Sequence, residues 1–335
     1  MLLRDFDNLF FRSHNCRSKH SLIQLTIRHG GIPTGNLQTR STHLSLPQTR
    51  TNTVADKPIQ DLVSCMGLPV AGNPTQFMME RCFADCELDW RYLTLEVPAE
   101  NLKDAMAGFR AMGLRGGNFT IPHKVEVIQY LDGLSEAAER MGAVNCVNVV
   151  DGKLIGENTD GKGFVQSLKT LVEPAGQKVV IIGAGGAARA ISVELALSGV
   201  TEITIVNRTE ERGQELVDVL TQIEGVQARL IVLDGDYEVD DDVNVVINAT
   251  CIGLGDAEAR VPLDVETFNA DMVVADVVFN PPMTRLLRDA QARQCQTLDG
   301  LGMLVNQAVI GFKIWTGVDP NPAVMREALE EYLEI

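Results

Sequence analysis

Lys124 and Asp160 are the residues whose types and surroundings point most directly to acid–base chemistry. Lys124 ends the polar stretch GGNFTIPHK (116–124), in which a predicted strand passes into a helix, and Asp160 ends NTD (158–160) after another strand-like segment. In open α/β sheets, ligands bind where strands end. An ammonium can donate a proton to the alkoxide that develops from a ketone, and a nearby carboxylate can orient the ammonium and share that proton. We therefore predict that Lys124 and Asp160 form a proton-transfer pair.

A glycine-rich turn follows the strand-like run KVVII (178–182) and precedes a helix. In its pattern, Gly183-x-Gly185-x-x-Ala188, the first glycine permits a tight turn and the second lets backbone amides approach a pyrophosphate. The small third residue allows close packing of the helix, whose N-terminus offers unpaired N–H groups to the phosphates. In this setting the pattern predicts a Rossmann-type dinucleotide-binding domain.

The residues after the next strand predict which dinucleotide binds. Folds that bind NAD usually place a carboxylate there, about 20 residues beyond the glycines. This chain instead has Asn207-Arg208-Thr209, with Arg212 one helical turn further on. Arg208 and Thr209 can bind a 2′-phosphate that a carboxylate would repel, which predicts NADP. Two glutamates follow, so the alternative that the arginines are solvated surface charges stays open.

Other common proton donors of dinucleotide enzymes are absent from the sequence. Short-chain dehydrogenases use a tyrosine followed four residues later by a lysine, and none of the four tyrosines has that lysine. Hydroxyacid dehydrogenases use a histidine within or after the nucleotide domain, and no histidine follows His123. Serine–histidine–acid catalysis would also have to rest on His123 alone. These absences leave Lys124 and Asp160 as the candidates.

The overall composition disfavours several classes of function. The chain has 335 residues, of which 45% are hydrophobic, and a net charge of −16. That charge disfavours nonspecific binding to nucleic acid or to acidic membranes, and no apolar run approaches the ~18 residues that span a bilayer. Seven scattered cysteines, an odd number, favour a reducing compartment. Cys82 and Cys86 lack a second pair to complete a zinc site, so we predict no metal.

The chain divides into a basic tail and two alternating α/β segments. Residues 8–55 carry six basic residues and no acidic one, so we predict a disordered tail over 1–58. This composition is typical of an organellar transit peptide and also fits a wrongly assigned start; without targeting, we expect a cytoplasmic protein. Strands predicted at 61–66, 90–95 and 115–119 alternate with helices, and a helix predicted at 162–173 leads into a second series. The alternation predicts two α/β domains.

These residues together resemble the shikimate dehydrogenase family from about residue 59 to 335. The matching motifs are GNFTIPHK (117–124), GAVN (142–145), NTD (158–160), Gly183 to Ala188, NRT (207–209), NAT (248–250) and GMLVNQ (302–307). The resemblance implies a substrate domain with a mainly parallel sheet over 59–160 and 301–335, and a Rossmann-type NADP-binding domain over 161–300. The last helices would fold back onto the substrate domain.

The resemblance also implies an activity and further site residues. The activity is the reversible, NADPH-dependent reduction of 3-dehydroshikimate to shikimate, with Lys124 and Asp160 as the catalytic pair. The ring and hydroxyls of the substrate would be held by Asn118, Thr120, Asn145 and Gln307. The further cofactor contacts that it implies are Ala184, Gly186, Ala187, Asn207, Thr250, Val278, Gly300 and Met303.

Three positions depart from the family pattern around the substrate carboxylate. The family's Ser-x-Ser-Pro anchor falls on Asn73-Pro74-Thr75-Gln76, and Phe279 stands where the family usually has a tyrosine. Asn73 and Thr75 can hydrogen-bond a carboxylate, but their reach and donor geometry differ from those of two serines. Quinate or a related cyclic hydroxyacid therefore stays open as the substrate beside shikimate.

Two further functions also stay open. A noncatalytic NADP-binding sensor derived from such an enzyme would account for the altered anchor. A folate-type dehydrogenase has a similar two-domain plan, although the missing Tyr-x-x-x-Lys counts against it. We expect a small-molecule ligand, and a monomer or a homodimer.

Overall fold

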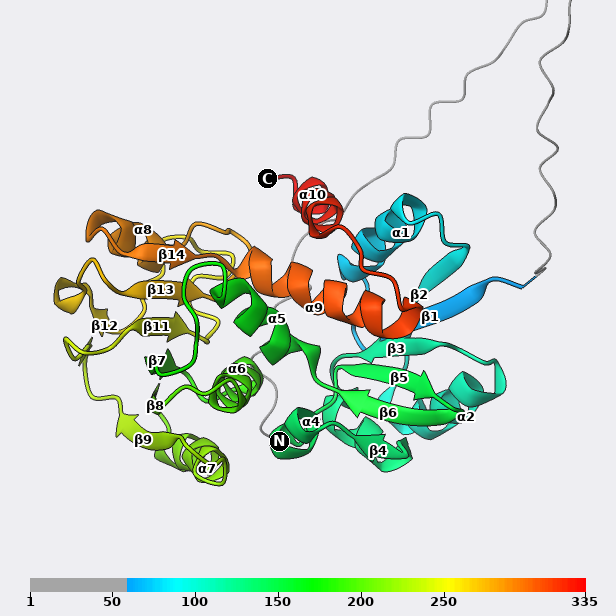
Figure 1. Cartoon of the computed structure of the whole chain (residues 1–335), viewed down its shortest axis with the longest axis horizontal. Coiled ribbons are helices and arrows are strands. Elements are labelled where there is room, and N and C mark those ends of the chain that lie inside the picture. Colours follow the sequence, from blue (N-terminus) through cyan, green and yellow to red (C-terminus); the bar gives the residue numbers. More distant parts are fainter. Residues whose placement is uncertain (1–58) are drawn as a thin grey trace, which may run out of the picture. The chain divides into compact units, whose positions relative to one another are not determined.

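The computed structural model describes residues 59–335, which form two α/β domains (Figure 1). The predictions of a disordered tail and of a transit peptide concern residues that lie outside the described range. Among the described residues, no helix has the length and the apolar character needed to cross a membrane.

The first domain contains a six-stranded sheet with the strand order β2-β1-β3-β5-β6-β4. Its strands are β1 (Asp61–Gly67), β2 (Trp90–Glu96), β3 (Gly116–Phe119), β4 (Gly133–Leu134), β5 (Cys146–Val150) and β6 (Lys153–Glu157). β1 runs parallel to β2 and β3, whereas β5 and β6 form an antiparallel hairpin beside β3. The hairpin turn is Asp151-Gly152, where both residues have positive φ, as a tight two-residue turn requires.

The second domain contains an all-parallel sheet with the order β14-β13-β11-β7-β8-β9. Its strands are β7 (Lys178–Ile182), β8 (Glu202–Asn207), β9 (Gln227–Val232), β11 (Val245–Asn248), β13 (Val273–Asp276) and β14 (Gln296–Leu298), and β10 (Tyr237–Glu238) pairs separately with β12 (Leu263–Asp264). The central strands are valine- and isoleucine-rich because helices bury both of their faces. The strand order reverses between β7 and β11, which is where a Rossmann fold binds its ligand.

Helices flank both sheets. They are α1 (Thr75–Asp85), α2 (Leu102–Ala111), α3 (His123–Glu126), α4 (Glu136–Met141), α5 (Thr159–Leu168), α6 (Gly186–Leu197), α7 (Glu210–Leu220), α8 (Arg285–Ala292), α9 (Gly300–Thr316) and α10 (Pro322–Leu333), with short 3₁₀ turns at Ala99–Asn101, Val127–Tyr130 and Val265–Thr267. In the first domain one apolar core joins β1 to α1, α9 and α10, and a second core includes α2.

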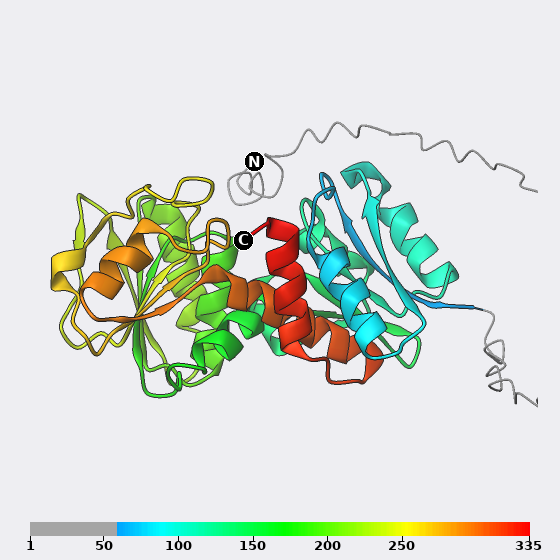
Figure 2. The same ribbon diagram turned by 90° about the horizontal axis from the view of Figure 1, so that it is seen from above.

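The C-terminal helices return to the first domain, as predicted (Figure 2). Met325 and Leu329 of α10 are fully buried in the core that contains β1 and α1. Trp315, near the end of α9, donates its Nε1–H to the carbonyl oxygen of Val147 in β5 at 3.0 Å. A segment from the far end of the chain therefore completes the first domain.

Helix α5, which links the two domains, begins earlier than predicted. The sequence predicted a helix over 162–173, but the helix starts at Thr159 and ends at Leu168. Asn158 caps it, because its Oδ1 accepts the backbone N–H of Asp160 at 3.1 Å. Asp160 therefore lies in the first turn of a helix and not, as predicted, at the end of a strand.

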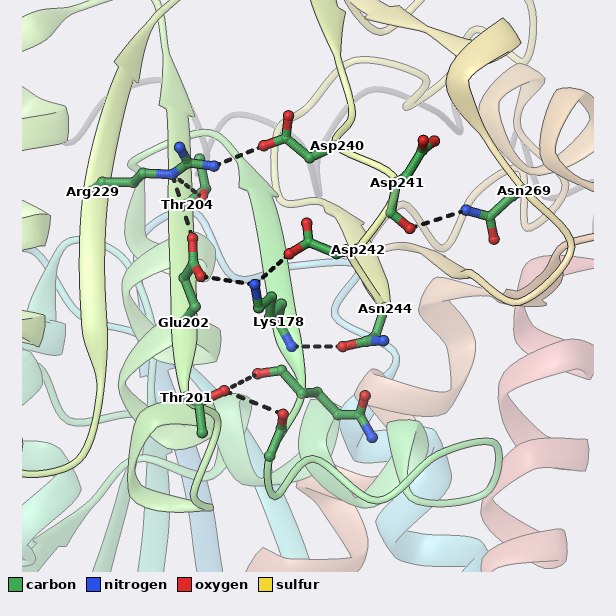
Figure 3. Close-up of polar contacts among 12 residues, drawn as sticks. Lys178, Thr201, Glu202, Thr204, Arg229, Asp240, Asp241, Asp242, Asn244 and Asn269 are labelled. Atoms are coloured by element: carbon green, nitrogen blue, oxygen red, sulfur yellow. Dashed lines mark hydrogen bonds and ion pairs between the residues drawn. The ribbon is translucent and has the colours of Figure 1, made fainter.

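A charged network lies at the amino ends of the second sheet (Figure 3). Lys178, the first residue of β7, pairs with Asp242 and with Glu202, and Arg229 pairs with Glu202 and with Asp240 at 2.9 Å. These side chains are largely exposed, so solvent and salt screen the pairs and each contributes little to stability. The network lies at the opposite ends of the strands from the glycine-rich turn, so we treat it as structural.

Candidate active site

Lys124 and Asp160, 36 positions apart in the chain, form an ion pair. Lys124 is in α3, which follows β3, and Asp160 is the second residue of α5, which follows β6. The lysine Nζ lies 3.1 Å from Asp160 Oδ2, and the side chains are 35% and 22% exposed. The two groups that the sequence singled out are thus within hydrogen-bond distance, as proton sharing requires, and both still reach solvent.

The Asp160 carboxylate is oriented by neighbours at the start of α5. Asn145 donates its Nδ2–H to Asp160 Oδ1 at 2.7 Å, while Oδ2 faces Lys124. Asn145 is itself held, because its Oδ1 accepts the backbone N–H of Thr159 at 2.7 Å. The N-terminus of the helix also favours a negative charge in its first turn. These contacts fix the direction in which the carboxylate meets the lysine.

Asn118 lies beside Asn145 in the same polar cluster. Its Nδ2 donates to the Asn145 carbonyl oxygen at 3.1 Å, and its Oδ1 accepts the Tyr92 hydroxyl at 2.6 Å. Tyr92 is only 1% exposed, and burial raises the pKa of its hydroxyl well above the usual value. Tyr92 therefore stays protonated and sets the orientation of the Asn118 amide. The sequence motifs did not indicate Tyr92; the only available signal was that a buried tyrosine needs a partner for its hydroxyl.

Gln307 and Thr120 each pack closely against a glycine. A Cβ at Gly163, one turn after Asp160 in α5, would lie 2.6 Å from the Gln307 backbone nitrogen. Helix α9 therefore places Gln307 directly against α5. A Cβ at Gly67, the last residue of β1, would lie 2.4 Å from Thr120 Cγ2. Both glycines allow these approaches. That Gln307 and Thr120 contact a substrate stays a prediction.

The residues at the altered anchor position form the start of α1. Asn73 Oδ1 accepts the backbone N–H of Thr75 at 2.9 Å, and Asn73 Nδ2 points toward the Sγ of Cys65, 3.8 Å away. Thr75 is buried. The Asn73 carbonyl oxygen therefore holds the turn at the start of α1, and contact of Asn73 or Thr75 with a substrate stays a prediction. Phe279, from the second domain, packs against the apolar core that contains α1 and β1.

The Gly183 turn has the backbone geometry that the sequence predicted. Gly183 has a φ of 109°, and a Cβ there would lie 3.0 Å from Thr250 Cγ2, so the position requires glycine. Gly185 and Gly186 are exposed at the start of α6, and Ala188 is fully buried. Ala184 and Ala187 complete the turn and the first residues of the helix. An exposed glycine turn at a helix N-terminus fits the pyrophosphate of a dinucleotide.

The predicted phosphate-binding residues lie at the end of β8 and the start of α7. Asn207 Nδ2 donates to the Thr209 carbonyl oxygen at 2.8 Å, which holds the turn. Arg208 and Thr209 are exposed. Within residues 59–335, neither Arg208 nor Arg212 takes part in an ion pair. Their guanidinium groups are thus accessible to an anion, and their contact with a 2′-phosphate stays a prediction.

The remaining predicted cofactor residues lie beyond β11 and β13. Thr250 follows β11, and its hydroxyl donates to Asn248 Oδ1 at 2.7 Å. Val278 follows β13, and a Cβ at Gly300 would lie 2.4 Å from the Val278 carbonyl oxygen. Met303, in the first turn of α9, packs against the core of the second domain. Thr250 and Val278 therefore lie at the carboxyl ends of β11 and β13, and Gly300 packs against Val278.

His123, although adjacent to Lys124, forms no hydrogen bond with the ion pair. It is fully buried, its Nε2 lies 2.7 Å from the Val97 carbonyl oxygen, and burial lowers the pKa of its ring. A buried imidazole bound to a backbone carbonyl serves the fold. Among the described residues, no group of three or more histidine, cysteine, aspartate or glutamate side chains has the geometry to hold a metal ion.

Comparison with known proteins gives three family matches along the chain. They are the shikimate dehydrogenase substrate binding domain over residues 65–147, shikimate / quinate 5-dehydrogenase over 166–253, and the shikimate 5′-dehydrogenase C-terminal domain over 300–330. A shikimate dehydrogenase (NADP(+)) of Methanopyrus kandleri is 42% identical over 279 residues, which are 82% of this chain and 96% of the relative.

Two solved structures extend the comparison. A ligand-free 5-ketofructose reductase of Gluconobacter sp. strain CHM43 is 47% identical with a TM-score of 0.81, over 82% of this chain and 99% of that one. A quinate dehydrogenase of Corynebacterium glutamicum in complex with NAD is 31% identical with a TM-score of 0.75, over 81% and 99%.

The fold, the glycine-rich turn and these relatives define an NAD(P)-dependent dehydrogenase with two α/β domains. The chain belongs to the shikimate dehydrogenase family.

Proposed function

We propose that this chain is an NADP-dependent dehydrogenase that reversibly oxidises a secondary hydroxyl of a small polyhydroxylated substrate, with Lys124 and Asp160 moving the proton. The observation that carries the proposal is the 3.1 Å contact between Lys124 Nζ and Asp160 Oδ2. When bound, NADP supplies or accepts the hydride. In the direction of reduction, Lys124 donates a proton to the substrate oxygen, and Asp160 orients the ammonium and shares its proton.

The polar groups around the pair would hold the substrate. We assign the ring and hydroxyls to Asn118, Thr120, Asn145 and Gln307. Tyr92 is hydrogen-bonded to the Asn118 amide and Asp160 to the Asn145 amide, which keeps each amide in a single orientation. A substrate hydroxyl would then meet donors and acceptors in fixed places, which favours one pose.

NADP is favoured over NAD by the charge at the end of β8. Arg208 and Arg212 offer guanidinium groups where NAD-binding folds usually place a carboxylate. The Methanopyrus relative is named for NADP(+), whereas the quinate dehydrogenase structure contains NAD. We therefore propose NADP as the preferred cofactor on the basis of the residues of this chain.

The first candidate substrate pair is shikimate and 3-dehydroshikimate. The set of residues assigned to the ring is complete, and the Methanopyrus relative is named as a shikimate dehydrogenase. Quinate remains a variant of this candidate, because the anchor position for the carboxylate carries Asn73 and Thr75.

The second candidate substrate is a neutral polyhydroxylated ketone such as 5-ketofructose. Two observations favour it: Asn73 and Thr75 replace the serine anchor of a carboxylate, and the relative with 47% identity is named as a 5-ketofructose reductase. A neutral substrate has no carboxylate to anchor. Loss of that anchor would then cost nothing in affinity.

A substrate panel separates these candidates. Purified full-length protein is assayed by NADPH absorbance with shikimate, quinate, 3-dehydroshikimate and 5-ketofructose, each with NADP(H) and with NAD(H). We expect kcat/KM with NADP(H) to exceed that with NAD(H) by tenfold or more, and one substrate to dominate. Binding of NADP in calorimetry without turnover of any substrate would instead support the noncatalytic sensor.

A further inference from the structure

Asp276, the last residue of β13, is a buried carboxylate that none of the proton-transfer steps uses. It is 1% exposed, and its two oxygens accept three hydrogen bonds. Oδ1 accepts the Asn248 Nδ2–H at 2.9 Å and the Val278 backbone N–H at 3.0 Å, and Oδ2 accepts the Thr284 hydroxyl at 2.7 Å. The donors come from three places: the neighbouring strand and both ends of the loop 277–284.

Asn248 extends this connection to a second loop. It is the last residue of β11 and pairs in register with Asp276. Its Oδ1 accepts the Thr250 hydroxyl at 2.7 Å, and its Nδ2 also donates to the Ile252 carbonyl oxygen at 3.1 Å. One carboxylate and one amide therefore join the loop 249–253 to the loop 277–284.

The two loops also lie close to each other and to the glycine-rich turn. Gly255, two residues beyond the loop 249–253, donates its N–H to the Asn280 carbonyl oxygen at 3.0 Å. A Cβ at Gly253 would lie 3.2 Å from Thr284 Cγ2, and one at Gly183 would lie 3.0 Å from the carbonyl oxygen before Thr250. Packing at this distance transmits a shift of one loop to the others.

The strand order indicates which half of a dinucleotide these loops face. The pyrophosphate of a Rossmann ligand lies at the turn after β7, and the adenosine half extends over β8, where Arg208 is exposed. The nicotinamide half must then extend the other way, over β11 and β13. Phe279 of the loop 277–284 packs against the first domain, so this loop is on the side of the cofactor domain that faces the substrate.

We propose that Asp276 is a positioning residue that ties the loops 249–253 and 277–284 together and so holds the binding surface for the nicotinamide half of the cofactor. Its role is exerted through Asn248, Val278 and Thr284, and it touches neither the proton-transfer pair nor the substrate. The proposal rests on use of a dinucleotide by the family and is independent of which substrate is reduced.

Binding of a whole cofactor is compared with binding of its adenosine half by calorimetry. The ligands are NADPH and 2′,5′-ADP, or NADH and ADP if the protein prefers NAD. For Asp276→Ala we expect the Kd of the whole cofactor to rise tenfold or more and the Kd of the half to stay within twofold. Asp276→Asn keeps one acceptor oxygen for Asn248 and Val278 and should restore most of the affinity. A general loss of protein stability would instead raise the Kd of both ligands by a similar factor.

Asp264→Ala is the control, because Asp264 is a carboxylate of the same domain that, like Asp276, ends a strand and accepts a backbone N–H two residues later, from Glu266 to Oδ1 at 3.0 Å; the variant should bind both ligands like the parent protein. If Asp276→Ala does not fold, Thr284→Val removes one of the three hydrogen bonds and should raise the Kd of the whole cofactor two- to fivefold. Unchanged binding of the whole cofactor, or an equal loss for both ligands, overturns the proposal.

Discussion

At the scale of single residues, Lys124 and Lys162 form a natural pair for comparison. Each lysine is in or next to the active-site elements, each is about one-third exposed, and each pairs with a carboxylate: Lys124 with Asp160 and Lys162 with Glu157. Only Lys124 pairs with a carboxylate that Asn145 also holds. Acid–base chemistry is therefore expected from one lysine and not from the other.

We expect Lys124→Ala to lower kcat by about 10² to 10⁴, because a positioned general acid contributes a factor of that size. The Kd of NADPH, measured by calorimetry, should stay within twofold. Lys162→Ala should retain kcat within threefold. Similar losses of turnover and of NADPH affinity in Lys124→Ala would show that the lysine supports binding and not the transition state.

Asp276 should also leave a signature in the pH dependence of stability. Burial, only partly offset by its hydrogen bonds, raises the pKa of its carboxyl from 3.8 to about 6. A raised pKa in the folded state means that the stabilisation is complete below the unfolded pKa and is lost as pH rises through the folded one. At ~1.4 kcal/mol per unit, the loss is about 3 kcal/mol.

Asp276→Asn does not titrate at this position, so it isolates the effect. Relative to this variant, the parent protein should lose up to about 3 kcal/mol of unfolding free energy between pH 4 and pH 7. Urea unfolding at several pH values measures it. Parallel stability curves for the two proteins across this range would contradict the assignment. This loss of stability at neutral pH is expected if the Asp276 carboxylate is retained because it holds the loops 249–253 and 277–284.

At the scale of elements, the contact between α5 and α9 decides where Asp160 and Gln307 meet. Gly163 of α5 faces the α9 backbone, and a Cβ there would lie 2.6 Å from the Gln307 nitrogen and 2.7 Å from the Met303 carbonyl oxygen. Backbone atoms on both sides cannot move aside as a flexible side chain can. The separation of the two helices therefore depends on this glycine.

Gly163→Ala should destabilise the protein by about 1 to 3 kcal/mol, as overpacking does, and should raise KM for the substrate because Gln307 shifts. Gly108→Ala in α2 is the control: the nearest atom to its Cβ is Met112 Cε at 3.6 Å, and the gain in helix propensity should stabilise the protein by about 0.5 to 1 kcal/mol. Thermal and urea unfolding measure both. A stabilised Gly163→Ala would refute the close contact.

The elements also show where sequence patterns suffice. The alternation of apolar residues predicted β1, β2, β3 and the central strands of the second sheet, because burial requires those patterns. The start of α5 was missed by three residues, because Asn158 caps the helix through a side-chain contact that apolar periodicity does not report. β14 was missed because the strand has only three residues and is only partly buried.

At the scale of the whole molecule, the C-terminal helix α10 is expected to belong to the folding unit of the first domain. Its fully buried side chains, Met325 and Leu329, contact the core of β1 and α1, whereas the core clusters of the second domain contain no residue of α10. Loss of such side chains costs about 2 to 5 kcal/mol each, against a total stability of about 5 to 15 kcal/mol.

A chain that ends at Asn321 should therefore lose cooperative unfolding of the first domain in calorimetry. It should still bind the adenosine half of the cofactor, 2′,5′-ADP or ADP, because the site proposed for that half lies in the second domain. Deletion of Glu334 and Ile335 alone, both exposed, should change neither property. Loss of binding of the adenosine half in the longer truncation would mean that the two domains do not fold independently.

The sequence by itself determined the groups that have local signatures. Gly183 was indicated by a glycine pattern between a buried strand and a helix. Lys124 and Asp160 were indicated by their places after strand-like segments and by the rarity of other proton donors in the chain. All three residues could therefore be named from the sequence alone. The family resemblance added the residues with known motifs. None of this depends on the order of strands in a sheet.

Only the tertiary structure decided which of these residues meet and which unremarked ones support them. The 3.1 Å contact of Lys124 with Asp160 depends on the positions of β3, β6 and α5 in the fold. Tyr92 and Asp276 have no motif of their own; their importance comes from partners 26 and 28 positions away in the chain, Asn118 and Asn248. A buried polar group must find a partner, and the partner is set by strand register, which one sequence does not report.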